Sequence, residues 1–172
     1  MSKISMIGLG CPKNQVDAEQ MLYTLKNAGF TIGVPEAEAD AIIVNTCGFI
    51  EDAKSEAIEN ILEAAQYKKD GNCKAVIVTG CLAERYKDDV TAEIPEADVC
   101  VGIGSNGDIA KIVRRAIEGK TENSFGDKCD HAAIVLACAK HRTDGVLVPT
   151  LFKIYVTAHN TVGTKEVFKT VV

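Results

Sequence analysis

The chain has 172 residues, of which 47% are hydrophobic and 25% are charged, and its formal net charge is −5. This composition is typical of a globular domain with a sizeable core, and no apolar run reaches the roughly 18 residues that a membrane-spanning helix needs. Because the N-terminal apolar run is too short for a secretory signal and no block of basic residues occurs, we expect a cytoplasmic protein that binds neither membranes nor nucleic acids directly.

Short apolar segments alternate with amphipathic ones along the first half of the chain. Residues 3–8 and 41–46 (AIIVNT) predict buried strands, and residues 30–34 predict a short strand. Residues 15–28 place their apolar side chains on one helical face, and Gly29 predicts the end of that helix.

The same alternation continues through the second half. A long helix is predicted over residues 50–68, then a buried strand over 74–79, a helix over 82–90, a strand over 98–102 and a helix from Asp108. The apolar residues of the long helix predict one buried stripe, made of Ile50, Ala53, Ala57, Ile58, Ile61, Leu62 and Ala65.

Strands that alternate with helices predict an α/β fold with a parallel sheet and helices on both faces. Five strands suit a flavodoxin-like (Rossmann-like) sheet of order 2-1-3-4-5. We expect this domain to occupy residues 1–120. The polar residues 121–130 predict a linker, and the rest of the segment 121–172 is a C-terminal appendage to which no elements are assigned.

Three of the seven cysteines recur at equivalent positions. Cys11 follows the strand in "ISMIGLGC", Cys47 follows "AIIVNTC" and Cys81 follows "AVIVTGC", and a helix comes after each. Because the carboxyl ends of parallel strands share one edge, and the three strands are neighbours in the predicted order, we expect these thiols to converge.

Thiols at this edge suit a soft metal or an iron–sulfur cluster. Helix N-termini carry partial positive charge, so a lowered thiol pKa is expected there. Three cysteines would leave one iron of a four-iron cluster without a protein thiolate, which is typical of a reactive site. Two sets of residues would support such a site: glycines for close backbone approach (Gly8, Gly10, Gly48 and Gly80) and hydrogen-bonding groups for the sulfur atoms (Asn14, Asn45 and Thr46).

The other cysteines have simpler interpretations. Cys73 and Cys100 lie beside or within strands and are interpreted as structural. The spacing of the remaining two from the nearby histidines fits no strong zinc template; these residues are Cys129, Cys138, His131 and His141.

A non-enzymatic alternative is a flavodoxin-like binding module in which the strand-end cysteines are merely buried. The glycine-rich "GIGSNGD" at residues 102–108 precedes a helix but lacks the spacing of a phosphate-binding loop. A third possibility is that three close thiols hold zinc, or form a disulfide in air.

Three segments resemble a known family: "LGCPKNQVDAEQM", "VNTCGFIEDAKSEAIENILEAA" and "VTGCLAERY". They are similar to the N-terminal domain of the radical-SAM methylthiotransferases, and the likeness extends over residues 3–120. The resemblance implies that Cys11, Cys47 and Cys81 bind an auxiliary 4Fe-4S cluster whose open iron takes part in sulfur insertion. It assigns no catalytic side chain to this domain.

The amino-acid sequences of two motifs favour one branch of that family. Gly-Cys-Pro-Lys-Asn at residues 10–14 and Cys-Gly-Phe-Ile-Glu-Asp-Ala-Lys at 47–54 resemble the enzymes that methylthiolate an aspartate of a small-subunit ribosomal protein. The alternative branch, which modifies tRNA adenosine, more typically has Gly-Cys-Gln-Met-Asn at the first site. The resemblance therefore implies a ribosomal protein as the substrate of the full-length enzyme.

The radical-SAM motif C-x-x-x-C-x-x-C does not occur in this sequence. The resemblance implies that S-adenosylmethionine and a second 4Fe-4S cluster bind to a radical-SAM domain outside this chain, which would be its partner. We therefore expect that this chain alone does not cleave S-adenosylmethionine.

Overall fold

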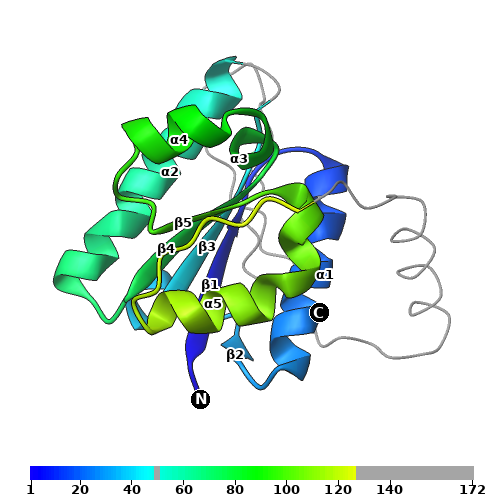
Figure 1. Cartoon of the computed structure of the whole chain (residues 1–172). Coiled ribbons are helices and arrows are strands. Elements are labelled where there is room, and N and C mark those ends of the chain that lie inside the picture. The colour runs from blue at the N-terminus through cyan, green and yellow to red at the C-terminus, as the bar shows by residue number, and fades with distance from the viewer. Residues whose placement is uncertain (49–50, 127–172) are drawn as a thin grey trace, which may run out of the picture.

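Five parallel strands form the centre of the molecule, which is described for residues 1–48 and 51–126 by a computed structural model (Figure 1). The sheet has the order β2-β1-β3-β4-β5, and all of its pairings are parallel. The predicted α/β flavodoxin-like fold and its strand order are thereby confirmed. The strands are β1 (Lys3–Gly8), β2 (Thr31–Ile32), β3 (Ala41–Thr46), β4 (Ala75–Gly80) and β5 (Val99–Val101).

Helices cover both faces of the sheet. The α-helices are α1 (Pro12–Asn27), α2 (Glu51–Asp70), α3 (Cys81–Arg85), α4 (Lys87–Glu93) and α5 (Ile109–Ile117), and the 3-10 helices are η1 (Glu36–Glu38) and η2 (Ile103–Asp108). Helices α1 and α5 pack on one face, and α2, α3 and α4 pack on the other (Figure 1). Every residue of β3 and β4 is therefore buried, which explains why the sequences of these strands are apolar without alternation.

The two faces have separate cores. Ile43 and Ile77 point towards α1 and α5, whereas Ile42 and Val76 point towards α2, α3 and α4. Neighbouring residues of one strand alternate between the cores because successive side chains of a strand point to opposite faces.

Several element boundaries differ from the sequence-based expectation. Helix α1 begins at Pro12, where a residue without an N–H group loses no helical hydrogen bond. The helix predicted over 82–90 is two helices that meet at Tyr86, whose ψ of 43° is not helical. Ile58 and Leu62, predicted to lie in the buried stripe of α2, are 39% and 42% exposed.

The chain after α5 returns along the edge of β5. The Gly102 N–H donates to the Ser124 carbonyl at 2.8 Å, and the Ser124 N–H donates to the Cys100 carbonyl at 3.0 Å. The predicted appendage lies largely outside the described residues, as do the two cysteines and two histidines weighed as a zinc site. No helix in the described part of the chain is long and apolar enough to cross a membrane.

Candidate functional site

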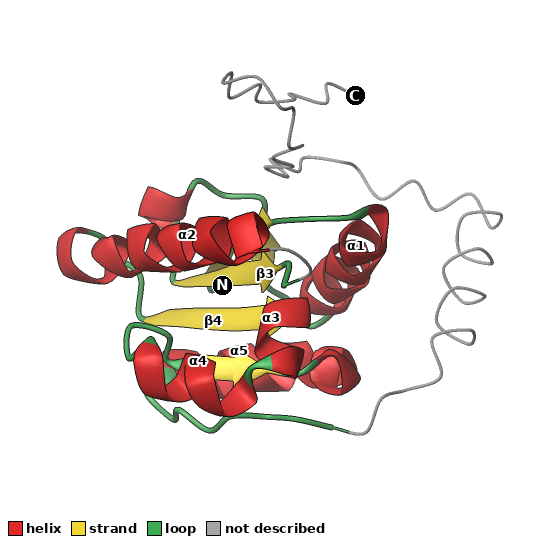
Figure 2. Ribbon diagram, turned by 90° about the horizontal axis from the view of Figure 1, so that it is seen from above, coloured by secondary structure: helices red, strands yellow, loops and turns green. Residues whose placement is uncertain are grey.

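The three strand-end cysteines lie at the carboxyl edge of three adjacent strands. Cys11 caps α1 three residues after β1, Cys47 directly follows β3, and Cys81 is the first residue of α3. Figure 2 shows the arrowheads of β3 and β4 pointing the same way, with α3 beginning at the tip of β4. We call the ends of β1, β3 and β4 with these three residues the cysteine edge.

The backbone segments of the cysteine edge are in close contact. A Cβ atom on Gly10 would lie 2.6 Å from the Cβ and 3.0 Å from the Sγ of Cys47, so only glycine fits beside this second cysteine. A Cβ atom on Gly80 would overlap the carbonyl oxygen of Thr46. Both glycines also have a positive φ, of 101° and 95°. The first and third cysteine segments therefore each contact the second, which supports the predicted convergence.

Buried hydrogen bonds fix the ends of β3 and β4. The Thr46 hydroxyl donates to the Thr79 carbonyl at 2.6 Å, and the Asn45 side-chain amide donates to the Asn14 carbonyl at 2.8 Å. Of the three residues expected to hydrogen-bond sulfur, Asn14 is the one with such a contact, since its Oδ1 accepts from the Cys81 Sγ at 3.7 Å. The side chains of Asn45 and Thr46 donate to backbone carbonyls instead.

Burial changes the electrostatics of the third thiol. Desolvation raises the pKa of Cys81, the Lys13 ammonium opposes this effect, and the Cys47 and Cys11 thiols add to it. The expectation that a helix N-terminus lowers the thiol pKa is therefore wrong for Cys81. Helix α3, which begins at Cys81, has only five residues. The half-buried thiolate therefore loses more hydration free energy than it gains from the partial positive charge at the N-terminus of so short a helix.

The cysteine edge offers thiol sulfur atoms, which are the type of ligand that binds iron–sulfur clusters. Cys11 is exposed, Cys47 and Cys81 are half-buried, and all three are free thiols. As the side chains stand, the described residues contain no group of three or more Cys, His, Asp or Glu side chains that could hold a metal ion. Ligation would therefore require the three thiols to rotate towards one another from backbone positions that are already close.

The two cysteines interpreted as structural are buried. Cys73 is 6% exposed and its Sγ donates to the Ala75 carbonyl at 3.3 Å, while Cys100 is 1% exposed within β5. Both lie in the core on the α2 face, as expected of small apolar side chains.

Two contacts at the cysteine edge were not expected from the sequence. The Arg85 guanidinium donates to the Gly48 carbonyl at 3.3 Å and so joins α3 to the segment after Cys47. Glu84 accepts from the Ile103 N–H at 3.0 Å through its Oε2. Both residues follow Cys81 within one helical turn, and this spacing is the signal that could have indicated them.

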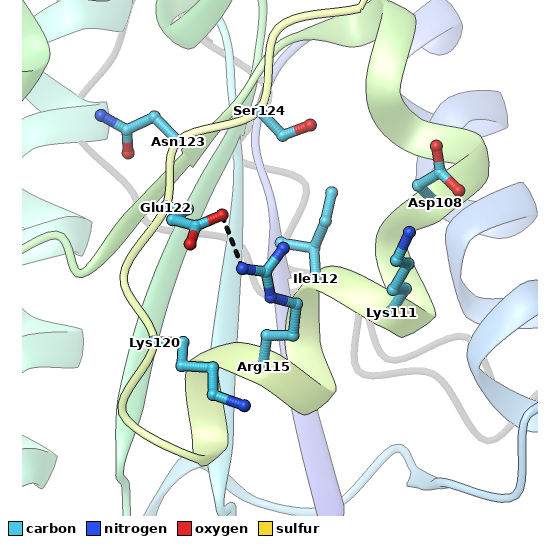
Figure 3. Close-up of a pocket in the computed structure, with 8 residues that line it drawn as sticks. All are labelled: Asp108, Lys111, Ile112, Arg115, Lys120, Glu122, Asn123 and Ser124. Carbon is cyan, nitrogen blue, oxygen red and sulfur yellow. Dashed lines mark ion pairs between the residues drawn. The ribbon is translucent and has the colours of Figure 1, made fainter.

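A pocket of about 130 Å³ lies away from the cysteine edge, between α5 and the returning segment (Figure 3). Its lining includes no cysteine, and an ion pair of 2.5 Å joins Arg115 to Glu122 across it. The pocket and the cysteine edge are therefore separate features.

Comparison with known proteins gives a family match and many relatives. The model described as "Uncharacterized protein family UPF0004" matches residues 3–102. The chain is 55% identical over 124 residues to the ribosomal protein uS12 methylthiotransferase RimO of Desulforamulus reducens, covering 72% of this chain and 28% of that protein. It is 51% identical over 125 residues to the RimO of Lachnoclostridium phytofermentans (73% and 28%), and 54% identical over 117 residues to that of Pelotomaculum thermopropionicum (68% and 26%). The chain spans about a quarter of the length of these relatives.

Proposed function

The chain belongs to the UPF0004 family, and from this premise we propose that its cysteine edge binds an auxiliary 4Fe-4S cluster through Cys11, Cys47 and Cys81. One observation carries the proposal. Three thiols, 36 and 34 residues apart in sequence, occupy the carboxyl ends of adjacent strands. Gly10 and Gly80 allow the backbone segments at these strand ends to lie in close contact. Three thiolates satisfy three irons of such a cluster and leave the fourth without a protein ligand.

The residues of the cysteine edge have distinct parts in this proposal. Cys47 and Cys81 are half-buried and would fix the cluster against the sheet, while the exposed Cys11 would cover its outer side. The Lys13 ammonium favours the thiolate form of Cys81 and would offset part of the negative charge of a thiolate-ligated cluster. When bound, the cluster would supply an iron with an exchangeable position for a sulfur ligand.

We further propose that this domain serves in the β-methylthiolation of an aspartate on ribosomal protein uS12. Relatives named as ribosomal protein uS12 methylthiotransferases match about 70% of the chain at half identity or better, and the motifs at residues 10–14 and 47–54 favour the same branch. S-adenosylmethionine and a second 4Fe-4S cluster would bind to a radical-SAM domain. That domain, rather than nucleic acid, would be the partner of this one.

The test is anaerobic reconstitution of the 172-residue chain with ferrous iron and sulfide. We expect about four irons and four sulfides per chain, with the absorption and EPR spectra of a 4Fe-4S cluster. Cys11→Ser, Cys47→Ser and Cys81→Ser should each lose the cluster, because each removes one of three thiolate ligands.

The matched controls are Cys73→Ala and Cys100→Ala, which remove buried thiols that do not belong to the cysteine edge. Both should keep the full iron and sulfide content. A binding module with merely buried cysteines would instead show no stoichiometric cluster in the wild type. Its strand-end Cys→Ser variants would lose only a little stability.

A further inference from the structure

One buried side chain contacts the backbone or sulfur of all three cysteine segments. Asn14 is 2% exposed and lies in the first turn of α1, the third residue after Cys11. Its Nδ2 donates to the Leu9 carbonyl at 2.9 Å and to the Thr46 carbonyl at 2.8 Å. Its Oδ1 accepts from the Cys81 Sγ at 3.7 Å.

The orientation of this amide is fixed by its partners. Both Nδ2 protons are used by carbonyl oxygens, so the Oδ1 atom necessarily faces the third cysteine. The main-chain carbonyl of Asn14 in turn accepts from the Asn45 side chain at 2.8 Å. A reversed amide would place its oxygen against two carbonyl oxygens, which is unfavourable in a buried site.

The position of Asn14 explains how one residue reaches three segments. Side chains in the first turn of a helix point back towards its N-terminus, which for α1 is the cysteine edge itself. Leu9 precedes Cys11 by two residues and Thr46 directly precedes Cys47, so the two carbonyls that Asn14 binds belong to the segments that carry the first two thiols.

We propose that Asn14 is the positioning residue of the cysteine edge, joining the segments of Cys11, Cys47 and Cys81 so that only side-chain rotation is needed for three thiols to bind one metal centre. The proposal rests on the proposed function for the identity of that centre. The predicted role of Asn14 in hydrogen-bonding sulfur involves one thiol, whereas this role concerns the relative placement of all three.

The experiment titrates the metal-free, reduced full chain with Co²⁺, whose sulfur-to-metal charge-transfer absorption reports the number of bound thiolates. For wild type we expect three-thiolate binding, in keeping with the preference of soft ligands for such metals. Asn14→Ala should weaken Co²⁺ affinity about 10–100-fold, as outer partners of metal ligands commonly do, and should lower the charge-transfer intensity per bound metal.

Asn60→Ala is the matched control. The Asn60 side chain donates to the Glu56 carbonyl at 2.7 Å within α2, so the same amide is removed from a helix away from the cysteine edge. It should leave both affinity and charge-transfer intensity unchanged. Asp98→Ala, which removes a brace at the opposite end of the sheet, shows whether lost stability alone weakens binding.

Each outcome decides the proposal. An Asn14→Ala protein that is folded and binds Co²⁺ with wild-type affinity and intensity overturns it, and so does an equal loss of binding in Asp98→Ala. If Asn14→Ala does not fold, Asn14→Ser keeps one donor, and an unchanged affinity and intensity in that variant also overturns the proposal. Should wild type bind Co²⁺ through three thiolates but build no cluster, the proposed function fails while the role of Asn14 is still decided by its variants.

Discussion

The two ends of the sheet are held together by different chemistry. At the amino end the braces are charged: Asp98 accepts from the Lys68 ammonium at 2.6 and 2.7 Å and from the Val76 N–H at 2.8 Å, which ties α2 to the starts of β4 and β5. Asp40, at the start of β3, accepts from the Lys3 N–H at 2.8 Å.

At the carboxyl end the buried hydrogen bonds come mainly from neutral amides and hydroxyls, alongside the partly buried Arg85 and Glu84. Asn14, Asn45, Thr46 and Thr79 are each at most 2% exposed, and their hydrogen bonds go mainly to backbone carbonyls. These neutral groups fix the backbone without adding charge, whereas the Asp17 carboxylate is close enough to add to the desolvation that raises the pKa of Cys81. The difference would suit an amino end that stabilises the fold and a carboxyl end that, as proposed, receives an anionic, thiolate-ligated group.

The close packing of the carboxyl end is tested most strongly by Gly80→Ala. The added Cβ would lie 2.7 Å from the Asn45 Oδ1 and would overlap the Thr46 carbonyl, at a φ of 95° that alanine disfavours. We expect a loss of about 3 kcal/mol or more in the free energy of unfolding, because steric overlap adds to backbone strain. Urea unfolding measures the loss, and iron content after reconstitution should fall with it.

Gly29→Ala is the matched control for Gly80→Ala. Gly29 has a similar φ of 88°, but no atom lies within 4 Å of the Cβ position, so only the backbone strain remains. We expect about 1–2 kcal/mol of destabilisation and full iron content. Equal losses in the two variants would mean that the cysteine edge is not tightly packed.

The amino end is tested by Asp98→Ala. Removing this carboxylate leaves the Val76 N–H and a partly buried Lys68 without their acceptor, and we expect a loss of about 2 kcal/mol. Unfolding in urea should show this loss, while iron content under folding conditions stays at the wild-type value. Lower iron content in the folded variant would contradict the division between the two ends.

The exposed pair of Lys3 and Glu38 provides the control for Asp98→Ala. Its side chains are 45% and 58% exposed, so Lys3→Ala should change the free energy of unfolding by less than about 0.5 kcal/mol.

Much of the fold could be predicted because the strands are buried on both faces. The strand predicted over 41–46 has the observed bounds of β3, since covering both faces leaves a continuous apolar run in the sequence. The surface of α2 could not be predicted as well. Its apolar residues surround more of the helix than the sheet covers, so Ile58 and Leu62 are exposed while Ala64 is buried.

The site could be predicted in part for a similar reason. The equivalent places of Cys11, Cys47 and Cys81 after strands follow from local patterns. The contacts of Asn14 join residues 5, 32 and 67 positions apart, and no local pattern indicates which partners a buried amide will find. The pKa of Cys81 could not be predicted because the helix N-terminus can be recognised in the sequence, whereas the burial of the thiol cannot.

A further small effect concerns Asp40 and its pH dependence. The hydrogen bond from the Lys3 N–H, with the Lys74 ammonium, holds the pKa of Asp40 below its ordinary value of 3.8. A lowered folded-state pKa adds stability that is present above that ordinary value and is lost as the pH falls through the folded-state pKa. Asp40→Asn should therefore cost less than about 1 kcal/mol near neutral pH, given solvent screening of this partly exposed group, and nothing in strong acid. Urea unfolding of both proteins across this range measures the difference, and a gap that widens as the pH falls would mean that the amino end is not braced by this charge.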